Sequence, residues 1–109
     1  MPRSFPRVVR LAAQLLGAQV RQGRIDRGWT VAALAARAQV SPTTVKKVER
    51  GDPTVGLGVA LDVATLVGVP IFTDDQARLT EEVARARERL MLLPQRIREP
   101  EPRPIDDDF

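Results

Sequence analysis

The segment Thr30–Gly51, TVAALAARAQVSPTTVKKVERG, decides the fold of this 109-residue chain. Thr30 stands where it can cap a short helix over Val31–Ala38, because its side-chain oxygen can accept a free amide hydrogen at the helix start. Ser41 stands in the same relation to a second helix, Pro42–Arg50, in which proline occupies the first helical position and loses no hydrogen bond there. The segment therefore predicts two short helices joined by a tight turn.

Each of these two helices has an apolar face and an outward face. The positions expected to pack inward are Leu34, Ala35, Ala38, Val45 and Val48. The outward positions of the second helix are Thr43, Lys46 and Lys47. Such a pair can brace its first helix against DNA and insert the second into the major groove, as a helix-turn-helix unit does. Spacing alone does not decide this, because any helical bundle contains such pairs.

A longer helix is predicted before this segment, over Arg7–Arg27. Its apolar residues recur at roughly helical spacing and are Val8, Leu11, Leu15, Leu16, Val20 and Ile25. Gly17 and Gly23 weaken the pattern, so two shorter helices meeting near Gly17 are an alternative. Gly28 supplies a left-handed stop, and Trp29 after it is expected to anchor in the core.

Two more helices are predicted after the segment. Leu57–Val67 is rich in apolar residues and ends at Gly68, and residues 69–72 are expected to run over the core. Thr73 begins a capping-box sequence, TDDQ, that opens a helix reaching about Leu93. The apolar residues of this last helix form one seam, made of Leu79, Val83, Ala86, Leu90 and Leu93. The seam either pairs the helices of two chains or packs against its own domain.

Residues 95–109 are expected to form a disordered tail, because they are rich in proline and charge and carry too little apolar surface to order themselves. The end of this tail differs in character, since three acids, Asp106–Asp108, are flanked by Ile105 and Phe109. Such a segment can dock on a basic partner or serve only as a solubilising end, and both interpretations stay open.

Charge is distributed unevenly along the chain. The net charge is +3, but residues 1–51 carry ten basic and two acidic side chains, a balance of +8. Residues 52–109 carry seven basic and twelve acidic side chains, a balance of −5. A half this basic is typical of a protein that binds a polyanion, most simply nucleic acid, and is equally compatible with an arginine-rich solvated surface.

The residue types that are missing narrow the function further. The chain has no His and no Cys, so transition metals lose their preferred ligands and the usual nucleophile–base pairs lose a member. We expect no metal, no cofactor, no catalytic residue and no enzymatic activity. No apolar stretch approaches a membrane span and no signal peptide is recognised, so we expect a cytoplasmic protein, associated with the nucleoid when bound to DNA.

One pattern of residues extends across most of the first two thirds of the chain. It consists of Arg24-Ile25, Gly28-Trp29-Thr30, Leu34-Ala35, Ala38, Val40-Ser41, Thr44-Val45 and Val48-Glu49-Arg50-Gly51, followed by Leu57, Leu61, Ala64 and Val67-Gly68-Val69. The pattern resembles the lambda-repressor-like, or Xre-type, helix-turn-helix family over roughly residues 16–72. The resemblance implies an all-α, lambda-repressor-like bundle of about five helices, with the DNA-binding domain in residues 1–72. The helix predicted from Thr73 makes residues 73–94 an added C-terminal element, a candidate for dimerisation, and residues 95–109 form the predicted tail.

The resemblance also implies roles for individual residues. The base-facing positions would be Pro42, Thr43, Lys46 and Lys47, and the phosphate-contacting positions would be Ser41 and Thr44. Arg24 and Glu49 match an ion pair of the family that ties the first helix to the end of the recognition helix. We add three candidate flanking phosphate contacts, which are Arg21, Arg37 and Arg50. Two positions depart from the family pattern: Val31 replaces a frequent glutamine, and Gln39 replaces a turn glycine and must tolerate a left-handed backbone.

Residues 49–58, ERGDPTVGLG, carry a narrower resemblance to HipB-like antitoxins. That resemblance implies a homodimer that binds a double-stranded DNA operator, represses its own operon and partners a HipA-family kinase toxin. Two alternatives remain at this point. One is a stand-alone Xre-type regulator, and the other is a helix-turn-helix domain used only for protein interaction.

Overall fold

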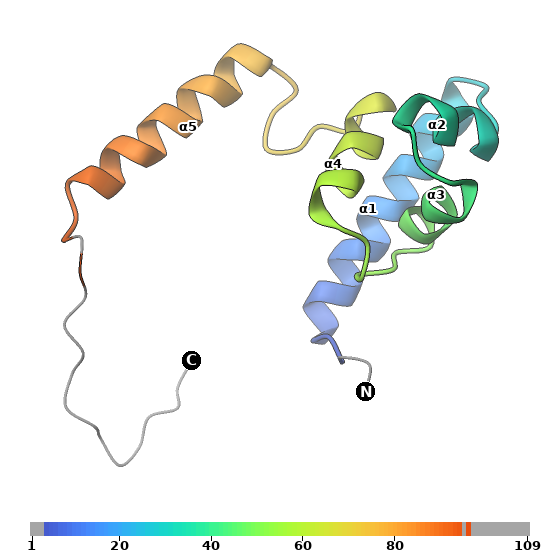
Figure 1. Cartoon of the computed structure of the whole chain (residues 1–109), viewed down its shortest axis with the longest axis horizontal. Coiled ribbons are helices and arrows are strands. Elements are labelled where there is room, and N and C mark those ends of the chain that lie inside the picture. The colour runs from blue at the N-terminus through green and yellow to red at the C-terminus, as the bar shows by residue number, and fades with distance from the viewer. Residues whose placement is uncertain (1–3, 95, 97–109) are drawn as a thin grey trace. The chain divides into compact units, whose positions relative to one another are not determined.

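The computed structural model describes residues 4–94 and 96, and over these residues the chain is all-helical, with no strand (Figure 1). The helices are α1 (Arg7–Asp26), α2 (Val31–Ala38), α3 (Pro42–Glu49), α4 (Leu57–Leu66) and α5 (Gln76–Met91). The chain divides into two compact units, residues 1–75 with α1 to α4 and a second unit that begins at Gln76. The predicted all-α class is confirmed, with four helices in the first unit and α5 as the added C-terminal helix.

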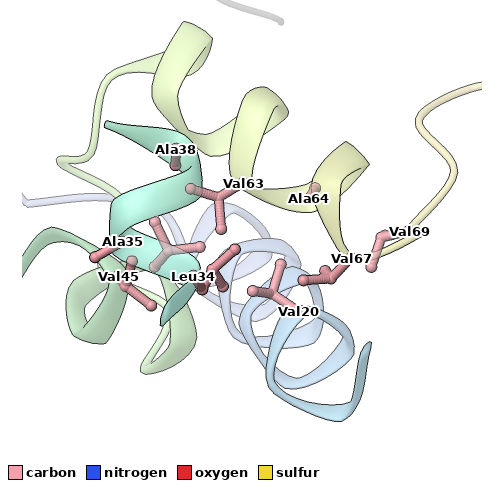
Figure 2. Packing of buried hydrophobic residues seen from close by; sticks show 10 residues of the cluster. Val20, Leu34, Ala35, Ala38, Val45, Val63, Ala64, Val67 and Val69 are labelled. Atoms are coloured by element: carbon pink, nitrogen blue, oxygen red, sulfur yellow. The ribbon is translucent and has the colours of Figure 1, made fainter. Parts of the chain in front are cut away.

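The core of the first unit is built from small and medium aliphatic side chains of all four helices and the residues after α4. Its buried members are Val20, Leu34, Ala35, Ala38, Val45, Val48, Val63, Ala64, Val67 and Val69. Figure 2 shows Leu34 of α2 near the centre of this cluster, with Val20, Val45 and Val63 around it from three other helices. Trp29 is half-buried and packs against the cluster. Because the core side chains are short, the helices must pack closely.

The ends of α2 and α3 are formed as the sequence predicts. The Oγ1 atom of Thr30 accepts a hydrogen bond from the amide of Ala33 at 3.0 Å, which caps α2. Gln39 ends α2 with φ 58° and ψ 42°, so this non-glycine residue does adopt the left-handed conformation that the turn requires. The turn between α2 and α3 therefore forms without a glycine.

Helix α1 differs from its prediction in continuity and in the residues that face the core. It runs unbroken through Gly17, so the alternative of two shorter helices is wrong. Among its predicted apolar positions, Val20 is buried and Leu16 half-buried, whereas the others, Val8, Leu11, Leu15 and Ile25, are exposed. The reason is that glycines occupy the positions of α1 that lie closest to neighbouring helices. A Cβ atom at Gly17 would overlap main-chain oxygens near the end of α3, and one at Gly23 would overlap the carbonyl oxygen of Val67.

The chain that follows α4 covers the core only in part. Val69 is buried and Ile71 is half-buried against the core, as predicted. Phe72 was expected to join them, and this is wrong, because its side chain is 95% exposed. Its backbone takes a left-handed φ of 65°.

The second unit begins with α5, two residues later than a capping box at Thr73 requires. Gln76 is the first residue of the helix, and the Thr73 hydroxyl accepts the amide of Asp75 at 3.1 Å in a short turn. The predicted capping box is therefore wrong. No residue of α5 is buried, and the seam residues Leu79, Val83 and Leu90 are all exposed. Apart from Arg96, the predicted tail, with its acidic end at Asp106–Asp108, lies outside the described residues.

Candidate DNA-binding surface

The outward surface of α3, which we call the α3 face, consists of Pro42, Thr43, Lys46, Lys47 and the following Arg50. Val45 and Val48 lie on the opposite side of the helix and are buried. Lys46 and Thr43 are exposed and Lys47 is half-buried. The α3 face therefore carries three positive charges and no acid, because the only acid of α3, Glu49, is held elsewhere.

Two hydroxyl groups lie at the N-terminal end of this face. Ser41 Oγ accepts a hydrogen bond from the amide of Thr44 at 3.2 Å and lies 3.0 Å from Thr44 Oγ1. Ser41 thus acts as the N-cap of α3, and Pro42 occupies the first turn. Pro42 has no amide hydrogen and the Thr44 and Val45 amides are bonded to Ser41, so the Thr43 amide and the positive end of the helix dipole lie beside these hydroxyls, a setting that suits a phosphate oxygen.

Arg24 and Glu49 hold the other end of α3. Arg24 Nε lies 2.6 Å from Glu49 Oε2 and Arg24 Nη2 lies 3.1 Å from Oε1, so the contact is bidentate. The Nη1 group of the same guanidinium donates to the carbonyl oxygen of Trp29 at 2.9 Å. The two charged side chains are only 12% and 10% exposed, and the hydrogen bond from Arg24 to Glu49 raises the pKa of Arg24. One guanidinium thereby connects α1, the end of α3 and the loop before α2.

Two glycines bring the backbones of α1 and α3 together. At Gly17 any side chain would collide with the carbonyl oxygens of Val48 and Glu49. At Gly51, which has a left-handed φ of 79°, a side chain would collide with the main chain of Gln14. The C-terminal end of α3 is therefore pressed against α1, which fixes the direction in which the α3 face points.

The two short helices are each capped at the start, and the second is held by the Arg24–Glu49 pair and carries a basic outward face. This arrangement agrees with a known family. A family model described as a helix-turn-helix domain matches residues 15–79, well over half of the chain. The chain belongs to this helix-turn-helix family. No curated protein and no solved structure matches the chain. The matched region begins within α1, so the first turns of α1, residues 7–14, lie outside it.

The three flanking arginines of this helix-turn-helix protein lie in different surroundings. Arg21 is exposed on α1. Arg50 is exposed beyond the end of α3, with its Nη2 atom 3.8 Å from Asp52 Oδ2. Arg37 stacks on Trp29, with Cζ 4.1 Å from the ring centroid, and donates to the carbonyl oxygen of Ala33 at 3.2 Å. Arg37 is thus engaged within the domain, Arg50 is exposed beside the acid Asp52, and Arg21 is exposed on α1.

Two further residues, Arg27 and Asp52, support the helix-turn-helix unit. Arg27 donates to the carbonyl oxygen of Val67 at 2.7 Å and so ties the end of α1 to the end of α4. No local signal in the sequence indicates this contact. Asp52 accepts hydrogen bonds from the hydroxyl of Thr54 at 2.6 Å and from its amide at 2.9 Å, which lower the pKa of Asp52. The spacing Asp-Pro-Thr is a recognisable signal for this turn.

Neither a metal cluster nor a membrane helix is found in the described part of the helix-turn-helix protein. Within residues 4–94 and 96, no three acidic side chains are grouped so that they could hold a metal ion. None of the described helices combines the length and the apolar character needed to cross a membrane.

Proposed function

We propose that this protein is a transcriptional repressor that reads a specific operator in double-stranded DNA through the α3 face. The observation that carries the proposal is the α3 face itself, a basic surface whose helix is capped at one end and held by the Arg24–Glu49 pair at the other. A rigidly held helix can present its side chains to base edges in a reproducible register, which sequence-specific binding requires.

In the proposed complex some residues contact base edges and others contact phosphates. Thr43, Lys46 and Lys47 enter the major groove, where a lysine donates to the acceptors of guanine and threonine contacts a base edge or a methyl group. Ser41 and Thr44 contact a phosphate together with the backbone amide of Thr43. Arg21 and Arg50 neutralise phosphates on either side, which adds affinity without adding sequence information.

A titration with operator-length DNA tests the proposal. The probe is a duplex from the region upstream of the gene that encodes this chain, and the control is a duplex of the same length and composition in shuffled order. We expect tighter binding to the upstream duplex, by a factor of about a thousand for a specific site. Equal affinity for the two duplexes would contradict sequence-specific repression at that region. No binding to either at low salt would favour a domain used for protein interaction.

We further propose that the repressor acts as the antitoxin of a toxin–antitoxin pair and partners a kinase toxin of the HipA family. The support is the likeness of residues 49–58 to HipB-like antitoxins. This segment covers the end of the α3 face and the turn that Asp52 stabilises. In this role the protein works in the cytoplasm, on its own operon at the nucleoid.

The antitoxin role has its own test, which does not depend on DNA. The gene next to this one should encode a kinase-like protein, and its product should arrest growth when expressed alone and not when expressed with this chain. The same co-expression with the chain shortened after Pro104 tests whether the acidic end takes part. A neighbouring gene of another kind, or arrest that this chain does not relieve, would leave a stand-alone regulator.

A further inference from the structure

Helix α5 has an apolar seam whose side chains are not buried. All 16 residues of α5 are exposed, including Leu79, Val83 and Leu90, whose exposed fractions run from 38% to 65%. An isolated helix of this length is only marginally stable in water, and helices in proteins gain most of their stability by burying an apolar stripe. We therefore infer that the seam is buried against another apolar surface.

The shape of the seam indicates what that surface is. Within α5 its residues are Leu79, Val83, Ala86 and Leu90, at intervals of four, three and four, and Leu93 follows three residues later, just beyond the end of the helix. A helix that packs on a globular core has an apolar stripe about three residues wide in every seven, whereas a seam of two in seven is typical of helices that pair with one another. We propose that α5 pairs along this seam with α5 of a second copy of the chain, and that this pairing is the dimer interface of the protein.

The charges beside the seam fit a second copy. In a parallel pair, Glu82 would face Arg87 of the second copy, and in an antiparallel pair it would face Arg89. Either orientation brings opposite charges together twice by symmetry, and neither sets like charges face to face across the seam. Within one helix, Glu82 already contacts Arg85 at 3.2 Å, on the side that leads away from the seam. The flanks of α5 are thus self-complementary.

This inference deepens the proposed repressor function, because one helix-turn-helix unit covers only half of a two-fold operator. The pairing joins two α3 faces into one molecule. It is nevertheless tested without DNA, so a protein that dimerises and does not bind DNA would overturn the repressor and leave the interface standing.

The first experiment measures the mass of the full chain by light scattering across a range of concentrations. We expect about twice the 12.0 kDa of one chain. The variant Leu79→Asp with Leu90→Asp places charge in the seam and should be monomeric. The matched control, Ala84→Asp with Met91→Asp, adds the same charge to the outer side of α5 and should stay dimeric. A monomeric natural chain, or a dimeric seam variant, would overturn the proposal.

A second experiment does not rely on disrupting the helix. Glu82→Arg should weaken self-association roughly tenfold, because two attractive pairs become repulsive. Mixing this variant with Arg89→Glu, or with Arg87→Glu, should restore a dimer of the two different chains, seen by native mass spectrometry, and the partner that restores it reports the orientation. If neither mixture forms the mixed dimer, the charges beside the seam do not meet and the proposed interface is wrong.

Discussion

Arg24 and Glu49, which lie 25 residues apart in the sequence, meet in a bidentate ion pair at the C-terminal end of α3. Because the pair is nearly buried, the cost of removing water from both charges offsets much of their attraction, so its net contribution to stability is small. Its effect is on geometry. A planar guanidinium that bonds both carboxylate oxygens and the carbonyl oxygen of Trp29 permits only one placement of α3 against α1.

Glu49→Ala should lower the free energy of unfolding by about 3 kcal/mol, because Arg24 would stay mostly buried without its carboxylate. Urea denaturation followed by circular dichroism measures the change. The double variant Arg24→Met, Glu49→Leu removes both charges and should recover most of the loss. The explanation would be wrong if the single variant were as stable as the natural chain, or if the double variant were less stable than the single one. Either result would show that the unpaired buried charge of Arg24 does not cause the loss of stability.

Gly17→Ala should destabilise the protein by roughly 1–3 kcal/mol, although alanine favours helices, because its methyl group would overlap the carbonyl oxygens of Val48 and Glu49. Gly58→Ala is the matched control, since Gly58 lies in α4 with open space around it, and it should be neutral or stabilise by up to about 1 kcal/mol. Thermal unfolding of both variants gives the comparison. Equal effects at the two sites would mean that α1 and α3 can move apart without cost.

Replacing Lys46 and Lys47 with Ala should weaken operator binding and flatten its salt dependence, by roughly one unit of log–log slope for each phosphate that the lysines no longer neutralise. Should one lysine read guanine, its removal would instead relax specificity at one base pair by about 1–3 kcal/mol. The control, Arg78→Ala with Arg85→Ala, removes the same charge from α5. An unchanged affinity of the lysine variant at physiological salt would exclude docking through the α3 face.

Arg21 and Arg37 are both predicted phosphate contacts, but we expect Arg37 to contribute mainly to stability and Arg21 mainly to DNA binding. Arg37→Ala removes a guanidinium from the Trp29 ring and should cost about 0.5–1 kcal/mol of stability, with little change in the salt slope of DNA binding. Arg21→Ala should leave stability unchanged and lower the slope. Unfolding curves and anisotropy titrations on both variants decide the point. The reverse pattern would show that Arg37 leaves Trp29 when DNA binds.

The pKa of Asp52 should lie below its ordinary value in the folded protein, because Thr54 donates two hydrogen bonds to its carboxylate. A lowered pKa means that the turn is stabilised above the ordinary pKa of an aspartate and loses this support as the pH falls through the pKa of the folded state. Carbon-detected NMR titration of Thr54→Val should show the Asp52 pKa rising. Thr65→Val, whose hydroxyl contacts a different residue, should leave it unchanged.

The sequence alone determined the parts of this fold that depend on neighbours within one or two helical turns. The caps at Thr30 and Ser41, the buried positions Val45 and Val48 and the outward lysines follow from spacing and from side-chain chemistry that acts locally. The Arg24–Glu49 pair was anticipated only through the family resemblance, since nothing in the spacing of two residues 25 apart indicates that they meet.

Tertiary structure alone decided which side of α1 faces the bundle. Hydrophobic spacing favoured Leu11 and Leu15 as much as Val20, but of these three the core accepts only Val20. At Gly17 the helix presents bare backbone instead, because α3 crosses α1 too closely for a side chain. The same holds for the contact between Arg37 and the Trp29 ring, which no local signal in the sequence indicates. Contacts of this kind depend on the distance and angle between helices, and those quantities arise only when all four helices pack around one core.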